Sequence, residues 1–308
     1  MVLQTGLLFV LGLLWSLRLS AIKAAGMSGI PVHVVVTLSA LGIALFFTGV
    51  ALLRRDWPPL DRGTLGFYGL SGLLGFLAPL VLETAVGPHL PVFVFVVIIA
   101  TMPLFTFGLA ALVGRERMRA GPLMAIALGF VGAVAILWDV SRGSSVGATR
   151  GGWILAAFGV PLLYALNTVF VATRWPRHAS PVNVAQAQAL IVALAALMGS
   201  VAAGTTGAWT LAGLNAPALL LIVIGEGLAL VVYLRITRDY GATYVSFANY
   251  ASIGFAAVFG AVWFGDHLSG LTGLAALAII GSIILYQRQT RGPDSSDRPV
   301  AERGRSDG

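Results

Sequence analysis

The sequence predicts an all-α integral membrane protein in which ten transmembrane helices form two inverted five-helix repeats. Three observations support this prediction: the composition, the number of long apolar runs and an internal repeat. Of the 308 residues, 58% are hydrophobic and only 10% are charged, whereas about 25% of the residues in a soluble domain are charged. The polar surface is therefore too small to cover a water-facing globule of this size, and we expect the chain to lie in a membrane.

Ten apolar runs are long enough to cross a bilayer. A membrane-spanning helix needs about 20 mostly apolar residues, because its backbone polar groups must be satisfied internally across the hydrocarbon core. The predicted spans are residues 4–23, 31–53, 65–87, 91–113, 121–139, 152–173, 182–203, 217–236, 242–264 and 268–287.

The distribution of basic residues predicts the orientation of these spans. Of the 19 Lys and Arg residues, about 15 follow the even-numbered spans, and an excess of basic residues marks cytoplasmic loops. We therefore expect both termini on the cytoplasmic side of the cell membrane. Residues 288–308 are rich in Arg, Asp, Ser and Gly, and we expect a disordered cytoplasmic tail there because such a segment buries too little apolar surface to fold.

An internal repeat is visible at an offset of about 150 residues. The segments Ala100–Phe105 and Gly114–Met118 correspond in order to Tyr250–Phe255 and Gly265–Leu268. Because each copy holds an odd number of spans, the two copies cross the membrane in opposite senses, as in many secondary transporters. The predicted repeats are residues 4–139 and 152–287.

Several short motifs resemble one transporter family. They are Trp15-Ser16 followed by Lys23, Pro103 in the fourth span, Gly114-Arg115-Glu116-Arg117-Met118 before the fifth, and Gly265-Asp266-His267-Leu268 before the tenth. Together they resemble the EamA-like branch of the drug/metabolite transporter superfamily. The resemblance implies a ten-helix inverted-repeat transporter, often an exporter of amino acids or other small metabolites, that works by alternating access. Ser16, Arg18 and Ile253 depart from the family pattern and leave the substrate open.

Four charged residues lie inside predicted spans: Arg18, Lys23, Glu83 and Glu226. A charge in hydrocarbon costs at least ~2.5 kcal/mol on insertion scales, so each needs a partner or a wet cavity. Arg18 is either a fixed cation for an anionic substrate group, with Trp15 as an aromatic wall, or the structural partner of one of the two carboxylates. Lys23, near a helix end, either has a specific role or extends to the interface.

The two buried carboxylates are candidates for proton coupling. Glu226 lies midway along its span between Gly225 and Gly227, small residues that allow another helix or a substrate to approach. A buried carboxylate without a partner takes up a proton rather than remain charged, so Glu226 suits proton coupling or recognition of a substrate amine. Glu83 either titrates in the same way or pairs with Arg18 or Lys23. The opposite charges of Arg18 and Glu226 favour an amphoteric ligand.

Polar residues of the second half either line a cavity or form hydrogen bonds between helices. Among them, Asn249 and Tyr250 stand where the repeat offset places apolar residues, and Tyr164 and Asn167 belong to the same group. The complete set of candidate substrate-binding residues is Trp15, Arg18, Glu83, Glu226, Asn249 and Tyr250, with Glu226 and Glu83 as proton-coupling candidates. Small residues of the fifth and tenth spans are expected to form helix seams: Ala125, Gly129, Gly132, Ala278, Gly281 and Ser282.

Signatures of enzymes and cofactor sites are absent from the sequence. It has no cysteine, no metal-spaced histidines, no P-loop and no Gly-x-Ser-x-Gly motif, so we expect no catalytic residue, metal or cofactor. The leading hypothesis is a secondary transporter that exports a small polar metabolite. Uptake or exchange, a membrane-embedded enzyme acting on a lipid-linked substrate, and a structural subunit are the alternatives. Expected partners are a small-molecule substrate and the lipid bilayer but no nucleic acid, and a homodimer is left open.

Overall fold

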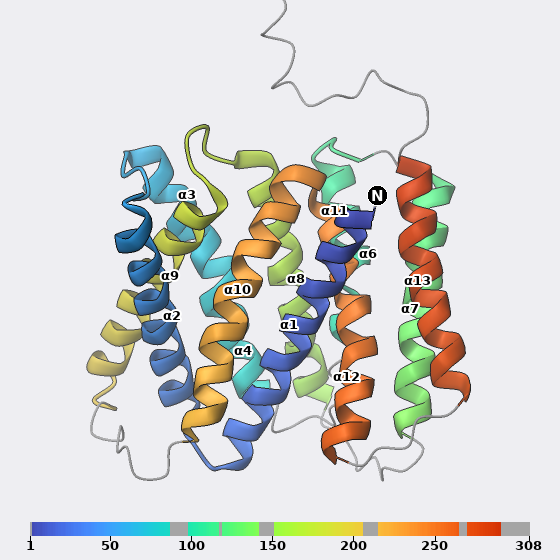
Figure 1. Cartoon of the computed structure of the whole chain (residues 1–308), viewed down its shortest axis with the longest axis horizontal. Coiled ribbons are helices and arrows are strands. Elements are labelled where there is room, and N and C mark those ends of the chain that lie inside the picture. Colours follow the sequence, from blue (N-terminus) through green and yellow to red (C-terminus); the bar gives the residue numbers. More distant parts are fainter. Residues whose placement is uncertain are drawn as a thin grey trace, which may run out of the picture.

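The computed structural model describes residues 2–86, 98–116, 119–141, 151–205, 215–264 and 270–290. Within these residues the regular elements are all helical. The helices run side by side along one direction and form a single bundle (Figure 1). The predicted all-α class is therefore confirmed.

The helices lie where apolar runs predict them, with shifts of a few residues at their ends. The predicted span 91–113 is described only from residue 98 onward, and the predicted span 242–264 is interrupted at Phe247. The elements are α1 Val2–Met27, α2 Val32–Arg54, α3 Arg62–Gly72, η1 Leu73–Leu77, α4 Ala78–Val86, α6 Met102–Leu112, α7 Ala120–Ser141, α8 Gly151–Arg174, α9 Pro181–Ala202, α10 Ala216–Tyr240, α11 Ala242–Ser246, α12 Ala248–Phe264 and α13 Gly270–Thr290.

Among the described residues, six continuous helices are long and apolar enough to cross a bilayer, and three shorter apolar helices accompany them. The six are α1, α2, the continuous helix α3–η1–α4, α8, α9 and α10. This identifies a multi-pass membrane protein, while the count of ten spans and the inverted repeat stay predictions. The last helix continues to Thr290, so residues 288–290 of the predicted tail are helical, and the rest of that tail lies outside the described residues.

The predicted cytoplasmic loops lie at one end of the bundle. In Figure 1 the N-terminus, the start of α3 and the C-terminal end of α13 are all at the upper end. Basic residues gather there, because the last turns of α2, α8, α10 and α13 lie at this end and each contains an arginine (Figure 1). The observed arrangement therefore keeps the predicted basic loops on one side.

A π-helical turn interrupts the third span. Residues Leu73–Leu77 form η1 between α3 and α4, and the backbone N–H of Ala78 donates to the carbonyl of Leu73. Pro79 follows at once; it has no N–H to donate, and its ring would clash with a carbonyl one turn earlier in a regular α-helix. The wider turn relieves this conflict, and π-turns of this kind are frequent at functional sites.

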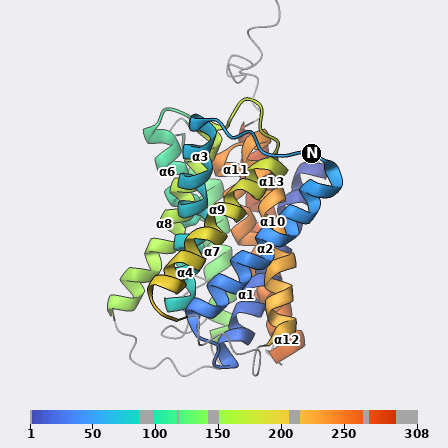
Figure 2. The same ribbon diagram turned by 90° about the vertical axis from the view of Figure 1, so that its left-hand side faces the viewer.

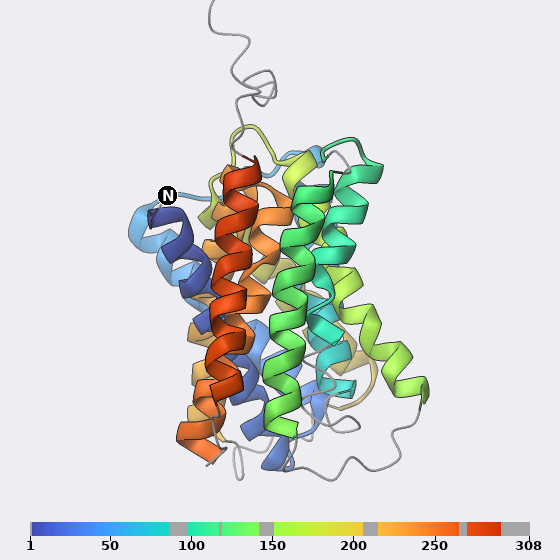
Figure 3. The same cartoon turned by 90° about the vertical axis from the view of Figure 1, so that its right-hand side faces the viewer.

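The predicted seam of small residues is present between α7 and α13, which lie side by side along their length (Figure 3). A Cβ added to Gly132 would lie 2.9 Å from the carbonyl oxygen of Ala275 and 3.3 Å from Cβ of Ala278. At Gly129 an added Cβ would meet the ring of Tyr250 and the hydroxyl of Ser282. Glycine at these two positions therefore allows the close approach of the helices.

Two groups of helices meet at the centre of the bundle. On one side α1 packs on α10 and α12, and on the other α4 packs on α8; Figure 2 shows the bundle turned by 90°. Long polar side chains extend from both groups into the space between them, and there they form the site described next.

Candidate functional site

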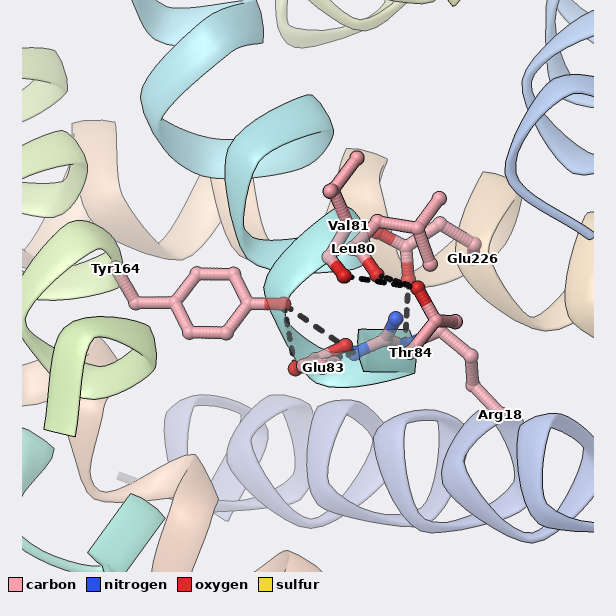
Figure 4. Close-up of polar contacts among 7 residues, drawn as sticks. All are labelled: Arg18, Leu80, Val81, Glu83, Thr84, Tyr164 and Glu226. Atoms are coloured by element: carbon pink, nitrogen blue, oxygen red, sulfur yellow. Dashed lines mark hydrogen bonds and ion pairs between the residues drawn. The ribbon is translucent and has the colours of Figure 1, made fainter. Parts of the chain in front are cut away.

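Arg18, Glu83 and Glu226 form a buried charge cluster at this junction (Figure 4). The Nη2 atom of Arg18 donates to both carboxylate oxygens of Glu83, at 3.0 Å and 3.2 Å. The Nε atom of Arg18 lies 3.1 Å from Oε2 of Glu226. The side chains of Arg18, Glu83 and Glu226 are 6%, 2% and 11% exposed, so a single guanidinium contacts two largely buried carboxylates.

The two carboxylates are held differently. Glu83 accepts three hydrogen bonds, two from Arg18 and one from the hydroxyl of Tyr164 at 3.0 Å. Glu226 is close enough to Arg18 for an ion pair, but neither Nε of Arg18 nor Oε2 of Glu226 has a partner with hydrogen-bond geometry among the described residues. Glu83 is therefore fixed in place, whereas Glu226 is attracted by charge without a directional bond.

Tyr164 on α8 completes the cluster. Its hydroxyl accepts from Nη2 of Arg18 at 3.3 Å and donates to Oε1 of Glu83. Next to Glu83, the hydroxyl of Thr84 donates to the carbonyls of Leu80 and Val81 in its own helix, so it does not compete for the carboxylate. Four helices, α1, α4, α8 and α10, thus contribute one side chain each.

The two glycines that flank Glu226 on α10 face neighbouring helices. A Cβ added to Gly225 would lie 3.8 Å from the carbonyl oxygen of Leu14 and 3.9 Å from Cβ of Arg18. A Cβ added to Gly227 would lie 3.0 Å from the ring of Phe46. Gly227 therefore lets α2 approach α10 closely, whereas an alanine at Gly225 would make only ordinary contacts with α1.

A second, uncharged layer lies one to two helical turns from the charge cluster. Trp15 on α1 contacts the ring of Tyr233 on α10, with 6.1 Å between ring centroids. The hydroxyl of Tyr233 accepts from Nδ2 of Asn167 at 3.0 Å and lies 2.9 Å from the hydroxyl of Thr168. Asn167 is 2% exposed, and its Oδ1 has no hydrogen-bond partner among the described residues. We call Trp15, Asn167, Thr168 and Tyr233 the neutral layer.

The neutral layer lies on the same side of the cluster on every helix that contributes to it. Trp15 precedes Arg18 by one turn on α1, which runs downward in Figure 1, and Tyr233 follows Glu226 by two turns on α10, which runs upward. Asn167 likewise follows Tyr164 on α8. Tyr233 and Thr168 are site residues that the sequence analysis did not single out, although the seven-residue spacing from Glu226 to Tyr233 places both on one helix face.

Asn249 and Tyr250 contact residues outside the charge cluster and the neutral layer. Nδ2 of Asn249 lies 2.8 Å from the sulfur of Met102 on α6 and donates to the carbonyl of Ser246. The hydroxyl of Tyr250 donates to the carbonyl of Ile126 on α7 at 2.9 Å. Both contacts join helices, and neither brings these two residues to Arg18.

Parts of the motifs that suggested the family fall outside the described residues, among them Arg117, Met118 and residues 265–269. Glu116 is described and accepts from the hydroxyl of Tyr286 on α13 at 2.9 Å. The side chain of Lys23 is also outside the described residues. The alternatives for Lys23 therefore stay open.

Comparison with known families finds a match in the first part of the chain. Residues 4–138 match the EamA-like transporter family. The resemblance to the EamA-like transporter family is thereby confirmed over residues 4–138. Arg18 and Glu83 lie inside the matched residues, whereas Tyr164 and Glu226 lie beyond them.

A solved structure supports the fold over nearly the whole chain. The structure, titled "Crystal structure of protein", is similar with a TM-score of 0.71 over 94% of this chain and 98% of that chain, at 17% sequence identity. At that identity the similarity concerns the fold alone. No curated protein matches the chain.

Proposed function

We propose that the chain is a proton-coupled secondary transporter that exports a small polar metabolite by alternating access. The observation that carries this proposal is the buried cluster in which one guanidinium contacts two carboxylates. With all three groups ionised, the cluster has a net charge of −1. A buried net charge is costly, so a bound proton or a bound cation is required to balance it.

Glu226 is the group that exchanges this proton. Glu83 is saturated by three hydrogen bonds, whereas Glu226 accepts none among the described residues. The side chain of Glu226 is also the more exposed of the two, at 11% against 2%. A proton therefore reaches Glu226 at a lower cost in broken contacts.

The cluster also links the parts that must move in such a cycle. In the proposed arrangement, residues 4–139 and 152–287 are the two inverted five-helix repeats, and transport rocks one against the other. Arg18 and Glu83 come from the first repeat, and Tyr164 and Glu226 from the second. Protonation of Glu226 weakens its attraction to Arg18, so the charge state of the cluster biases the contact between the repeats.

Export and orientation rest on the family resemblance and on the basic loops. Arginines gather at the end of the bundle that holds the N-terminus, which favours a cytoplasmic location for that end in the cell membrane. Reporter fusions after Arg62 and Arg177 test this orientation, because both are expected to read as cytoplasmic.

Transport in proteoliposomes tests the function. The vesicles enclose a pH-sensitive dye and are exposed in turn to each of the twenty amino acids and their decarboxylated amines. We expect at least one compound to move protons through the wild type, and Glu226→Gln to abolish pH-driven transport, since glutamine preserves size but cannot titrate.

Asp239→Asn is the matched control, because Asp239 lies at the end of the same helix in an exposed ion pair with Arg235. This variant is expected to transport like the wild type. Undiminished pH-driven transport by Glu226→Gln, or no proton movement with any compound, contradicts the proposal.

A further inference from the structure

The charge count of the cluster restricts the kind of molecule that can bind beside it. Arg18 is the only basic side chain that contacts Glu83 or Glu226 within the described residues, and it already contacts both. A ligand carboxylate or phosphate would add to the excess negative charge and would have to displace one of these carboxylates from Arg18. A positively charged group instead balances the cluster without breaking the pair between Arg18 and Glu83.

A positively charged ligand group would bind at Glu226, the carboxylate in the cluster that accepts no hydrogen bond among the described residues. Oε2 of Glu226 is buried and accepts no hydrogen bond among the described residues, although Nε of Arg18 is 3.1 Å away. An ammonium group carries three donors and no acceptor. It therefore supplies both the charge and the directional hydrogen bond that Glu226 lacks.

The residues of the neutral layer lie next to the cluster and are those that the rest of such a molecule would contact. Trp15 lies one turn from Arg18, and its ring is tilted by 44° against the ring of Tyr233. Two aromatic rings favour an apolar or aromatic body and a nearby cation. Beyond them, the buried Oδ1 of Asn167 lacks a hydrogen-bond donor among the described residues, so a weak donor at the far end of the molecule also finds an acceptor.

We infer that the transported molecule is a monovalent amine with an apolar or aromatic body, whose ammonium group takes the place of the exchangeable proton at Glu226. This inference rests on the proposed function and adds the substrate class to it. It replaces the amphoteric ligand favoured by the sequence, because the positive charge of Arg18 is already engaged by two carboxylates. One proton leaves Glu226 for each amine that binds.

Calorimetric titration of the purified full chain tests the inference with four compounds of similar shape. They are phenethylamine, phenylalanine, 3-phenylpropionate and 2-phenylethanol, which are cationic, zwitterionic, anionic and neutral. We expect phenethylamine to bind at least tenfold more tightly than the other three. Titrations in two buffers of different ionisation enthalpy are expected to show the release of about one proton per bound amine.

Two variants locate the binding. Glu226→Gln is expected to weaken phenethylamine binding at least tenfold and to remove the proton release. Trp15→Leu is expected to weaken binding of phenethylamine while leaving that proton release at about one per bound amine. The comparison of the four compounds on the wild type needs no variant, so it remains decisive if a variant does not fold.

The outcomes separate this inference from the proposed function. Equal or tighter binding of phenylalanine or 3-phenylpropionate overturns the amine assignment, as does phenethylamine binding that is unaffected by Glu226→Gln. If no amine binds but another compound drives proton flux that depends on Glu226, the substrate class is wrong and the transporter proposal stands. If phenethylamine binds with proton release but neither it nor any other compound is transported, the amine site stands and the proposed function fails.

Discussion

Nη2 of Arg18 lies 3.0 Å and 3.2 Å from the two carboxylate oxygens of Glu83, 65 residues further along the chain. One nitrogen thus serves both oxygens, which leaves Nε of the same guanidinium free to face Glu226. Arg18 consequently holds one carboxylate by hydrogen bonds and the other by charge. The proposed division between a fixed carboxylate and an exchanging carboxylate follows from this geometry.

Removal of Arg18 is expected to destabilise the protein strongly. Arg18→Ala leaves two buried carboxylates without their cation, and the loss of one partner of a buried ion pair costs about 3–5 kcal/mol. Unfolding in detergent, followed by circular dichroism, measures the change. Arg235→Ala is the matched control, because its pair with Asp239 is long at 3.8 Å and exposed, so we expect a change of about 0–1 kcal/mol.

A triple variant tests whether the destabilisation of Arg18→Ala comes from the unbalanced charge of the cluster. In the triple variant Arg18→Met, Glu83→Gln and Glu226→Gln no charge remains in the cluster, and we expect most of the stability lost in Arg18→Ala to return. A triple variant as unstable as Arg18→Ala would show that packing around the arginine, not its charge, supports the helices.

Tyr164→Phe is expected to lower the stability of the protein. The phenol donates to Glu83 and accepts from Arg18, and a hydrogen bond to a charged group contributes about 1.5–3 kcal/mol. Without this donor, Glu83 keeps only its hydrogen bonds from Arg18, and unfolding in detergent measures the loss. A variant as stable as the wild type would show that the phenol contributes nothing to the cluster.

Gly75→Ala is expected to disrupt the neutral layer. A Cβ at this position of η1 would collide with the side-chain amide of Asn167, so the bond from Asn167 to Tyr233 is lost or the helices separate. Overpacking of this kind costs about 1–3 kcal/mol. Gly69→Ala is the control on the preceding helix α3, because a Cβ there meets nothing within 4 Å, and we expect it to stabilise by about 0.4–1 kcal/mol. Equal unfolding midpoints for the two variants would contradict the close contact.

Asp61, at the start of α3 and outside the membrane-spanning segments, makes a pH-dependent contribution to the stability of the fold. It accepts from the backbone N–H groups of Thr64 and Gly63 and from the hydroxyl of Thr64, and these bonds, led by the backbone N–H of Thr64, lower the pKa of the Asp61 carboxyl. A lowered folded-state pKa means that the stabilisation is present above the unfolded-state pKa and is lost as the pH falls through the folded-state value.

We therefore expect Asp61→Ala to lower the thermal midpoint at neutral pH. The difference from the wild type should shrink only at acid pH, below the ordinary aspartate pKa of about 3.9. Asp61→Asn keeps a side-chain oxygen that accepts hydrogen bonds, so we expect it to lower the thermal midpoint less than Asp61→Ala does. If the thermal midpoints of Asp61→Ala and the wild type differ by the same amount at pH 7 and in acid, the charge of Asp61 does not contribute to stability.

Sequence patterns predict the helices well because each span needs a continuous apolar run, and that requirement is local. They also find Arg18, Glu83 and Glu226, since charges are conspicuous among apolar residues. Which of these residues meet is a tertiary property, and the sequence leaves open whether Arg18 pairs with one carboxylate, with the other or with a substrate. The structure brings both carboxylates to Arg18.

Neutral residues are harder to predict, because a Tyr or an Asn in a membrane helix has the same sequence signature in a site and in a helix contact. Tyr233 and Tyr250 illustrate this. Tyr233 belongs to the neutral layer, whereas Tyr250 bonds to the backbone of α7. The π-turn at Leu73–Leu77 was also not predicted, although Pro79 marks the place where a regular helix has to change.

Glu226 is expected to carry a proton in the absence of substrate, and infrared difference spectroscopy of the full chain in lipid detects such a proton. A spectrum recorded on raising the pH is predicted to show the loss of a protonated carboxylic acid band in the wild type. This band should be present in Asp239→Asn and absent in Glu226→Gln. The same band in wild type and Glu226→Gln would contradict the account, because the exchanging proton would then reside elsewhere.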